Sequence, residues 1–108
     1  MGGRSARTKG SAAEREVINI LKEAGYTKVS RSPNSGGWIL KGDVLWWEDF
    51  FVEVKRQEKL SIPAWWQKCV EQAGSTKIPL LIFRRSREEW KVTMRLDDFL
   101  GLLEKSKK

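Results

Sequence analysis

The sequence contains no histidine, and this absence excludes several classes of catalytic site. Ser-His-Asp and Cys-His catalysis, and nuclease mechanisms that use a histidine base, all lack a required residue. The single cysteine, Cys69, cannot form a disulfide within the chain, which fits a reducing cytoplasm. It also leaves too few sulfur and nitrogen ligands for a structural zinc site. Any bound metal is therefore expected to be held by oxygen, which favours Mg²⁺ or Mn²⁺.

Long apolar stretches are also missing. No run approaches the roughly 18 residues that a membrane-spanning helix requires, so we expect no membrane partner. The N-terminal MGGRSARTKG is basic but lacks the apolar segment of a secretory signal. There are no repeats and no low-complexity tracts. The 108 residues therefore fit one domain, 1–108, with a basic N-terminal arm at residues 1–10.

Positive charge, by contrast, is in excess. The chain carries 21 lysine and arginine residues against 14 aspartate and glutamate residues, a net charge of +7. Such a surplus favours a polyanionic partner such as DNA, RNA or an anionic membrane surface. The lysines at the C-terminus fit a solubility role equally well.

Apolar periodicity predicts eight elements in the order α-β-β-β-α-β-β-α. Helices are expected at residues 11–24, 61–73 and 97–104, and strands at 28–31, 43–47, 51–56, 80–83 and 90–95. A loop rich in turn-forming residues follows the first strand, at residues 32–37. This order describes a mixed β-sheet flanked by helices, an α/β or α+β domain.

Two of the helices carry specific expectations. In the first, Ser11 and Glu14 have the spacing of a capping box, which would start the helix at this serine. In the last, an apolar stripe is expected to pack onto the core through Phe99, Leu100 and Leu103.

Asp43 and the segment Glu53-Val54-Lys55 lie on two β-rich runs that resemble a hairpin. Strand alternation places Glu53 and Lys55 on one face, which is the accessible face if the intervening valines belong to the core. With a three-residue turn centred on Asp49, Asp43 lies opposite Lys55 and shares that face. A two-residue turn would place Asp43 on the other face.

Two carboxylates and a lysine are the side chains that a Mg²⁺-dependent phosphodiesterase needs. A carboxylate-held Mg²⁺ neutralises charge on the phosphate, activates water and stabilises the leaving oxygen. Asp43 and Glu53 would be its ligands, the Val54 carbonyl would add a third oxygen, and Lys55 would orient or deprotonate the attacking water. An ordinary hairpin with exposed ion pairs fits the same spacing, and the spacing alone does not separate the two interpretations.

Beyond the hairpin, the sequence resembles the PD-(D/E)XK nuclease superfamily, and within it the archaeal-type Holliday junction resolvases. The resemblance runs from about Lys9 to Arg56, through KGSAAEREVINILKEAGY, VSRSPNSGG and the hairpin with Glu-Val-Lys. It implies a restriction-endonuclease-like fold and Mg²⁺-dependent paired nicking of four-way DNA junctions. It also implies a homodimer, because such a junction is two-fold symmetric. Gly42, not proline, precedes Asp43, a departure that leaves the acidic ligand in place.

The resemblance assigns roles residue by residue. Glu14 would complete the metal site with Asp43 and Glu53, and Lys55 would be the catalytic lysine. Residues expected to contact DNA are Lys9, Arg15, Arg31, Ser32, Asn34 and Ser35. The expected location is a prokaryotic cytoplasm, with a phage gene as one source. Two other functions stay open: a nuclease of the same superfamily acting on flap, nicked or single-stranded DNA, and a non-catalytic DNA-binding module.

Overall fold

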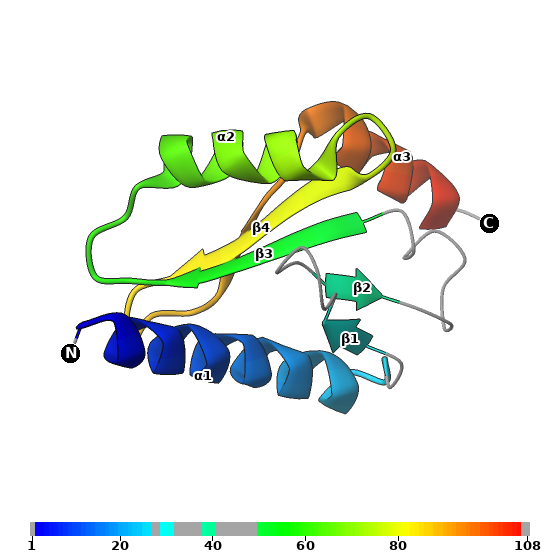
Figure 1. Cartoon of the computed structure of the whole chain (residues 1–108). Helices are drawn as coiled ribbons and strands as arrows, with labels where there is room; N and C mark the ends of the chain where they lie inside the picture. Colours follow the sequence, from blue (N-terminus) through cyan, green and yellow to red (C-terminus); the bar gives the residue numbers. More distant parts are fainter. Residues whose placement is uncertain (1, 27–28, 32–37, 41–49, 107–108) are drawn as a thin grey trace.

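A mixed β-sheet lies between two helices, one on each face (Figure 1). This computed structural model describes residues 2–26, 29–31, 38–40 and 50–106, and for 2–11, 29–31 and 38–40 it describes the backbone. The elements are α1 (Gly2–Glu23), β1 (Val29–Arg31), β2 (Trp38–Leu40), β3 (Phe50–Arg56), α2 (Ile62–Ala73), β4 (Ile78–Arg84), β5 (Lys91–Thr93) and α3 (Leu96–Ser106). The predicted order is confirmed, and the sheet flanked by helices is consistent with a restriction-endonuclease-like fold.

The sheet has the strand order β1-β2-β3-β4-β5. Strands β3 and β4 are parallel and in register from Phe50 opposite Ile78 to Arg56 opposite Arg84, whereas the other neighbours are antiparallel. Parallel neighbours need a long crossover, and α2 supplies it. The carboxyl ends of β3 and β4 therefore lie side by side at one edge of the domain (Figure 1).

The central strand β3 contributes to a core on each face of the sheet, because successive side chains of a strand point to opposite sides. Val52 packs with Val17 of α1 on one face, and Phe51 packs with Cys69 of α2 on the other. By alternation, Glu53 and Lys55 share the α2 face with Phe51. The expectation that this charged pair lies on an open, accessible face is therefore wrong, because a helix covers each side of the strand.

The predicted partner of β3 is also wrong where the structure describes it. Val52 lies opposite Trp38 of β2 on the side away from β4, and neither turn length considered above places Trp38 there. The run Trp38–Leu40 is itself apolar and strand-like, so local propensity could not decide between it and residues 43–47. Residues 43–47, and with them the face on which Asp43 lies, are outside the described residues.

Helix α1 begins at Gly2, nine residues before its predicted start. Residues 2–10 of the predicted basic arm are therefore part of this helix. Alanine, arginine and lysine in this segment are good helix formers. Ser11 consequently lies inside the helix and cannot cap it, because an N-cap residue precedes the first turn. The capping-box interpretation of Glu14 is wrong.

Helix α3 packs less closely than predicted. Leu102 contacts the core cluster around Val17 and Val52, but Phe99, Leu100 and Leu103 are between 45% and 51% exposed. The prediction that these three residues reach the core is wrong, because amphipathicity reveals an apolar side without revealing what it meets. None of the described helices is long and apolar enough to cross a membrane.

Candidate active site

Glu53 and Lys55 form the centre of the candidate site. They point to the same side of β3, as strand alternation predicts, and Lys55 Nζ lies 3.8 Å from Glu53 Oε1. Both side chains are largely withdrawn from solvent, with 17% of the Glu53 side chain and 25% of the Lys55 side chain exposed. At this distance the contact is a loose ion pair rather than a short hydrogen bond.

Burial raises the pKa of the Glu53 carboxyl above its ordinary value. The positive charges of Lys55 and Lys68 act in the opposite direction, and the negative charge of Glu14 adds to the rise. Together the two lysines do not offset the cost of withdrawing the carboxylate from water. A further cation beside Glu53 would stabilise its ionised form.

Glu14 acts on Glu53 from another layer of the fold. It lies on α1, whose Val17 packs on the opposite face of β3, and yet its charge acts on Glu53. Glu53 and Lys55 thus lie together, and Glu14 acts on Glu53 through its charge, while the role of Glu14 as a metal ligand stays a prediction. A pair of carboxylates beside a lysine is suited to holding a divalent cation through oxygen atoms.

The other predicted metal ligands are Asp43 and the Val54 carbonyl. Asp43 is outside the described residues, and among those that are described no three histidine, cysteine, aspartate or glutamate side chains gather into a metal site. The two carboxylates present fit a hard cation by their chemistry and by the raised pKa of Glu53, and Asp43 stays the predicted third ligand. The Val54 side chain packs against the core, and its carbonyl as a ligand stays a prediction.

The predicted DNA-binding residues are only partly visible. Arg15 is exposed on α1. Lys9 belongs to α1 and Arg31 belongs to β1, and the structure describes the backbone of both. Ser32, Asn34 and Ser35 are outside the described residues, so their role in contacting DNA stays a prediction.

A family model decides the relationship of this chain to known proteins. The family described as "Phage putative PDDEXK endonuclease" matches residues 5–108. The chain belongs to this family. Membership confirms the PD-(D/E)XK superfamily and extends over the half of the chain where the sequence offered only a pattern of elements. It supports a nuclease without indicating the archaeal-type resolvases, and no curated protein and no solved structure matches the chain.

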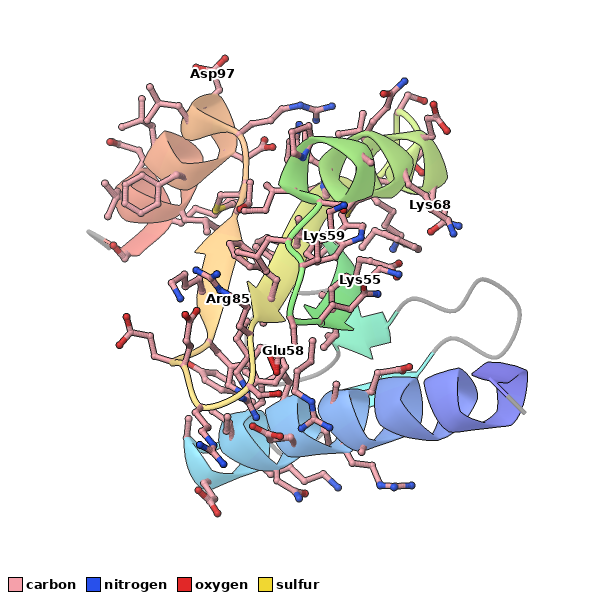
Figure 2. All side chains as sticks on the ribbon, turned by 90° about the vertical axis from the view of Figure 1, so that its left-hand side faces the viewer. Lys55, Glu58, Lys59, Lys68, Arg85 and Asp97 are labelled. Carbon is pink, nitrogen blue, oxygen red and sulfur yellow. The ribbon has the colours of Figure 1, made fainter. Side chains whose placement is uncertain are left out.

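Sequence reasoning missed one cation at the site of this PDDEXK endonuclease. Lys68 lies on α2, the helix that covers the Glu53 face, and its charge lowers the pKa of Glu53. Figure 2, which looks toward the carboxyl ends of β3 and β4, shows Lys55, Lys59 and Lys68 on the same side of the molecule. Lys68 precedes Cys69 in the sequence, but no pattern there indicates that this face of α2 covers Glu53.

Cys69 has no nucleophilic role in this nuclease. Its side chain is fully buried, with Sγ 4.0 Å from the Phe51 carbonyl oxygen. Burial, together with the nearby charge of Glu53, raises the pKa of the thiol to about 11. The thiol is therefore protonated at neutral pH and packs as an apolar side chain.

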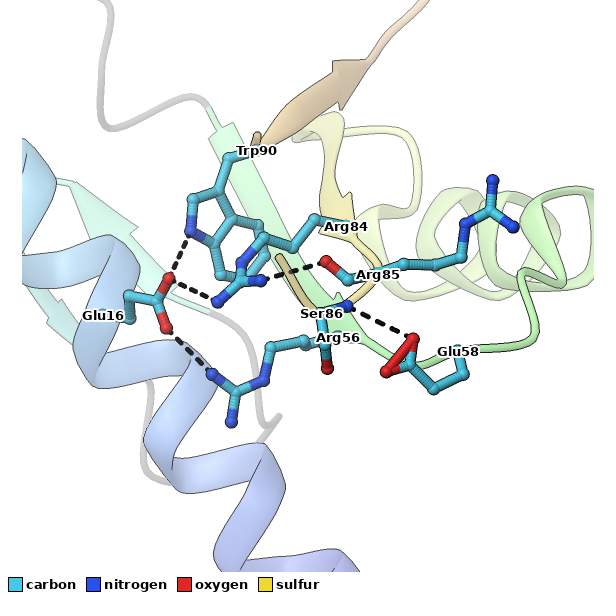
Figure 3. Close-up of polar contacts among 7 residues, drawn as sticks. All are labelled: Glu16, Arg56, Glu58, Arg84, Arg85, Ser86 and Trp90. Atoms are coloured by element: carbon cyan, nitrogen blue, oxygen red, sulfur yellow. Dashed lines mark hydrogen bonds and ion pairs between the residues drawn. The ribbon is translucent and has the colours of Figure 1, made fainter. Parts of the chain in front are cut away.

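A second charged cluster lies at the carboxyl ends of β3 and β4, around Glu16 of α1 (Figure 3). Arg56 Nη1 donates to Glu16 Oε2 at 2.9 Å, and Arg84 Nη2 donates to Oε1 at 2.7 Å. Trp90 Nε1 donates to the same Oε1 at 2.9 Å, and the Arg84 guanidinium lies 4.9 Å from the centre of the Trp90 ring. Partial burial raises the pKa of Glu16, but the hydrogen bonds from Trp90 and Arg84 outweigh it and leave the pKa below its ordinary value.

Proposed function

We propose that this family member is a Mg²⁺-dependent, structure-specific DNA endonuclease, and specifically a Holliday junction resolvase that makes paired nicks in four-way junctions. The observation that supports the nuclease chemistry is Glu53, a mostly buried carboxylate with a raised pKa beside Lys55. Membership of an endonuclease family supports the interpretation of Glu53 and Lys55 as part of a nuclease site. The junction specificity rests on the resemblance of residues 9–56 to the archaeal-type resolvases.

The proposed mechanism assigns a task to each residue of the site. Glu14, Asp43 and Glu53 would hold Mg²⁺ or Mn²⁺, which supplies charge neutralisation and an acidified water when it is bound. Lys55 Nζ would orient or deprotonate the attacking water, as predicted from the sequence. Lys68 adds a second positive charge to that of Lys55 on the α2 side, where a phosphate of the substrate would lie.

DNA binding would rest on the excess positive charge of +7. Phosphate contacts release counterions, so affinity should fall steeply as salt rises. A homodimer would place two sites on a two-fold symmetric junction, and Mg²⁺-dependent resolution would serve recombination or repair in a phage-infected prokaryotic cell.

Cleavage of synthetic DNA tests this proposal. The substrates are a four-way junction, a flap, a nicked duplex and a linear duplex, each incubated with and without Mg²⁺. Symmetrically paired nicks in the junction alone are the expected result. Equal cutting of flap or linear DNA would replace the resolvase with a broader nuclease, and binding without metal-dependent cleavage would leave a DNA-binding module.

Asp43→Asn is the sharpest variant for the metal ligand that lies outside the described residues. We expect cleavage to be abolished while affinity for the junction is largely retained, because one ligand of the metal is lost and the phosphate contacts are not. Electrophoretic mobility in Ca²⁺ measures affinity, and circular dichroism verifies folding. Simultaneous loss of binding and cleavage by a folded variant would refute the assigned role.

A further inference from the structure

The Glu16 cluster connects α1 to the same strand that carries Glu53. Arg56, which donates to Glu16, lies three residues after Glu53 on β3, about 10 Å along the strand. Glu16 lies two residues after Glu14 on α1, about 3 Å along the helix axis. The Glu16–Arg56 ion pair therefore joins the segment of α1 that carries Glu14 to the segment of β3 that carries Glu53.

The positions of the two glutamates on α1 relate the cluster to the site. Ala13 and Val17 are buried and form the inward stripe of this part of the helix. At about 100° per residue, Glu14 and Glu16 project from opposite flanks of that stripe. A rotation of α1 that moved Glu16 away from the strand ends would consequently also move Glu14 relative to Glu53.

Several features make the cluster specific and rigid. Arg56 and Arg84 lie directly opposite each other on β3 and β4, where like charges repel unless an anion lies between them. Glu16 supplies that anion, and the side chains of Arg56 and Arg84 are only 24% and 12% exposed. Trp90 adds a neutral donor and the face of its ring. Each partner comes from a different segment, so the carboxylate has one arrangement that satisfies all three donors.

We propose that Glu16 is a positioning residue of the nuclease, which fixes the rotation of α1 and thereby sets the position of Glu14 relative to Glu53. The inference deepens the proposed function and rests on it. It assigns Glu16 no contact with metal, water or DNA. Its effect reaches the metal only through Glu14.

Metal affinity, rather than cleavage alone, separates positioning from simple stabilisation. Mn²⁺ is titrated into the folded protein, and the signal of free Mn²⁺ is followed by electron paramagnetic resonance. We expect Glu16→Gln to raise the Kd for Mn²⁺ about tenfold, the lower end of the effect of groups that orient metal ligands. In a Glu14→Gln background, the same change should cause no further loss, because the ligand that Glu16 positions is already absent.

Glu88→Gln is the matched control. Glu88 also accepts from two cations, Arg85 at 3.2 Å and Lys91 at 3.2 Å, but both lie three residues from it along the chain, so these contacts do not connect α1 to the sheet. Its removal costs a similar pair of ionic contacts and should leave the Kd unchanged. Trp90→Phe keeps the aromatic ring and removes a single donor to Glu16, so it should raise the Kd less than Glu16→Gln does.

The outcomes separate this inference from the proposed function. If Glu53→Gln raises the Kd and Glu16→Gln leaves it unchanged, the positioning role is overturned and the proposed nuclease function stands. Equal losses from Glu16→Gln with and without Glu14 would also overturn it, because the effect would not pass through Glu14. Absence of Mn²⁺ binding in the unaltered protein would remove the proposed function and this inference with it. Should Glu16→Gln fail to fold, the Trp90→Phe result decides in the same way.

Discussion

Two glutamates have opposite electrostatic environments: Glu16 of α1, beside the carboxyl end of β3, and Glu53, in the middle of that strand. Glu16 accepts from three donors within 2.9 Å, and its pKa lies below the ordinary value. Glu53 has one lysine at 3.8 Å, and burial holds its pKa above the ordinary value. A charge that the fold satisfies stabilises the fold, whereas a charge that the fold leaves under-compensated marks a site for a ligand. The difference explains why only one of the two is a candidate metal ligand.

Glu53→Gln should have the largest effect. Cleavage of junction DNA should fall about 10³-fold or more, because losing several kcal/mol of metal-dependent transition-state stabilisation corresponds to that factor. In metal-free buffer the same variant should melt at a higher temperature, because it no longer buries a carboxylate without sufficient compensation. Thermal denaturation with and without Mg²⁺ measures the melting temperatures of the variant and the unaltered protein, and the cleavage assay measures the loss of activity. An unchanged melting temperature together with full activity would remove Glu53 from the site.

The gain in stability should depend on pH in a defined direction. An unfolded glutamate titrates near 4.5, and the folded pKa of Glu53 is higher. The folded protein therefore holds this proton more tightly, so the stability of the unaltered chain falls as pH rises from 4.5 through the folded pKa. Glutamine does not titrate. The advantage of Glu53→Gln should thus grow across that window and then level off, and a difference that is flat with pH would contradict the assignment.

Glu16→Gln should shift stability in the opposite direction. We expect the free energy of unfolding to fall by about 1–2 kcal/mol, because two ion pairs are lost from a side chain that is about one-third exposed and partly screened. The folded pKa of Glu16 is lowered, so its contribution is present above 4.5 and is lost as pH falls through the folded value. Urea denaturation at pH 7 and at pH 3.5 measures this. A larger loss at the lower pH would be the wrong sign.

Lys68→Ala should have the smallest effect of these variants. Its cation acts on Glu53 from an exposed position, so we expect cleavage to fall several-fold with little change in melting temperature. If Lys68 also meets a phosphate, the slope of log affinity against log salt should decrease by about one. Lys22→Ala, an exposed lysine in the last turn of α1, is the control. Equal losses from both variants would reduce Lys68 to a general surface charge.

The parts of the site that follow from local rules were predictable from the sequence. Strand alternation alone places Glu53 and Lys55 on one side of β3, and the structure confirms it. Glu14 needed the family resemblance, because its approach to Glu53 depends on how α1 docks. Lys68 could not be found, because the sequence did not reveal which face of the sheet α2 covers.

The remaining predictions failed because they depended on contacts between distant parts of the chain, which sequence patterns do not reveal. Glu16 meets Arg84, 68 residues further along the chain, and no periodicity connects the two. The strand beside Val52 proved to be β2, because two nearby runs had similar strand propensity. Phe99 belongs to a regular apolar stripe, and yet it is 45% exposed, since periodicity reveals no packing partner.

The lengths of the outer strands have a consequence for how copies of this protein behave at high local concentration. β1 and β5 occupy the two edges of the sheet, and each is three residues long. Short edges offer few unpaired amide groups to a neighbouring chain, and β5 begins with a lysine, a residue that disfavours strand addition. Copies of this protein at high local concentration therefore offer one another little edge along which their sheets could join into fibres.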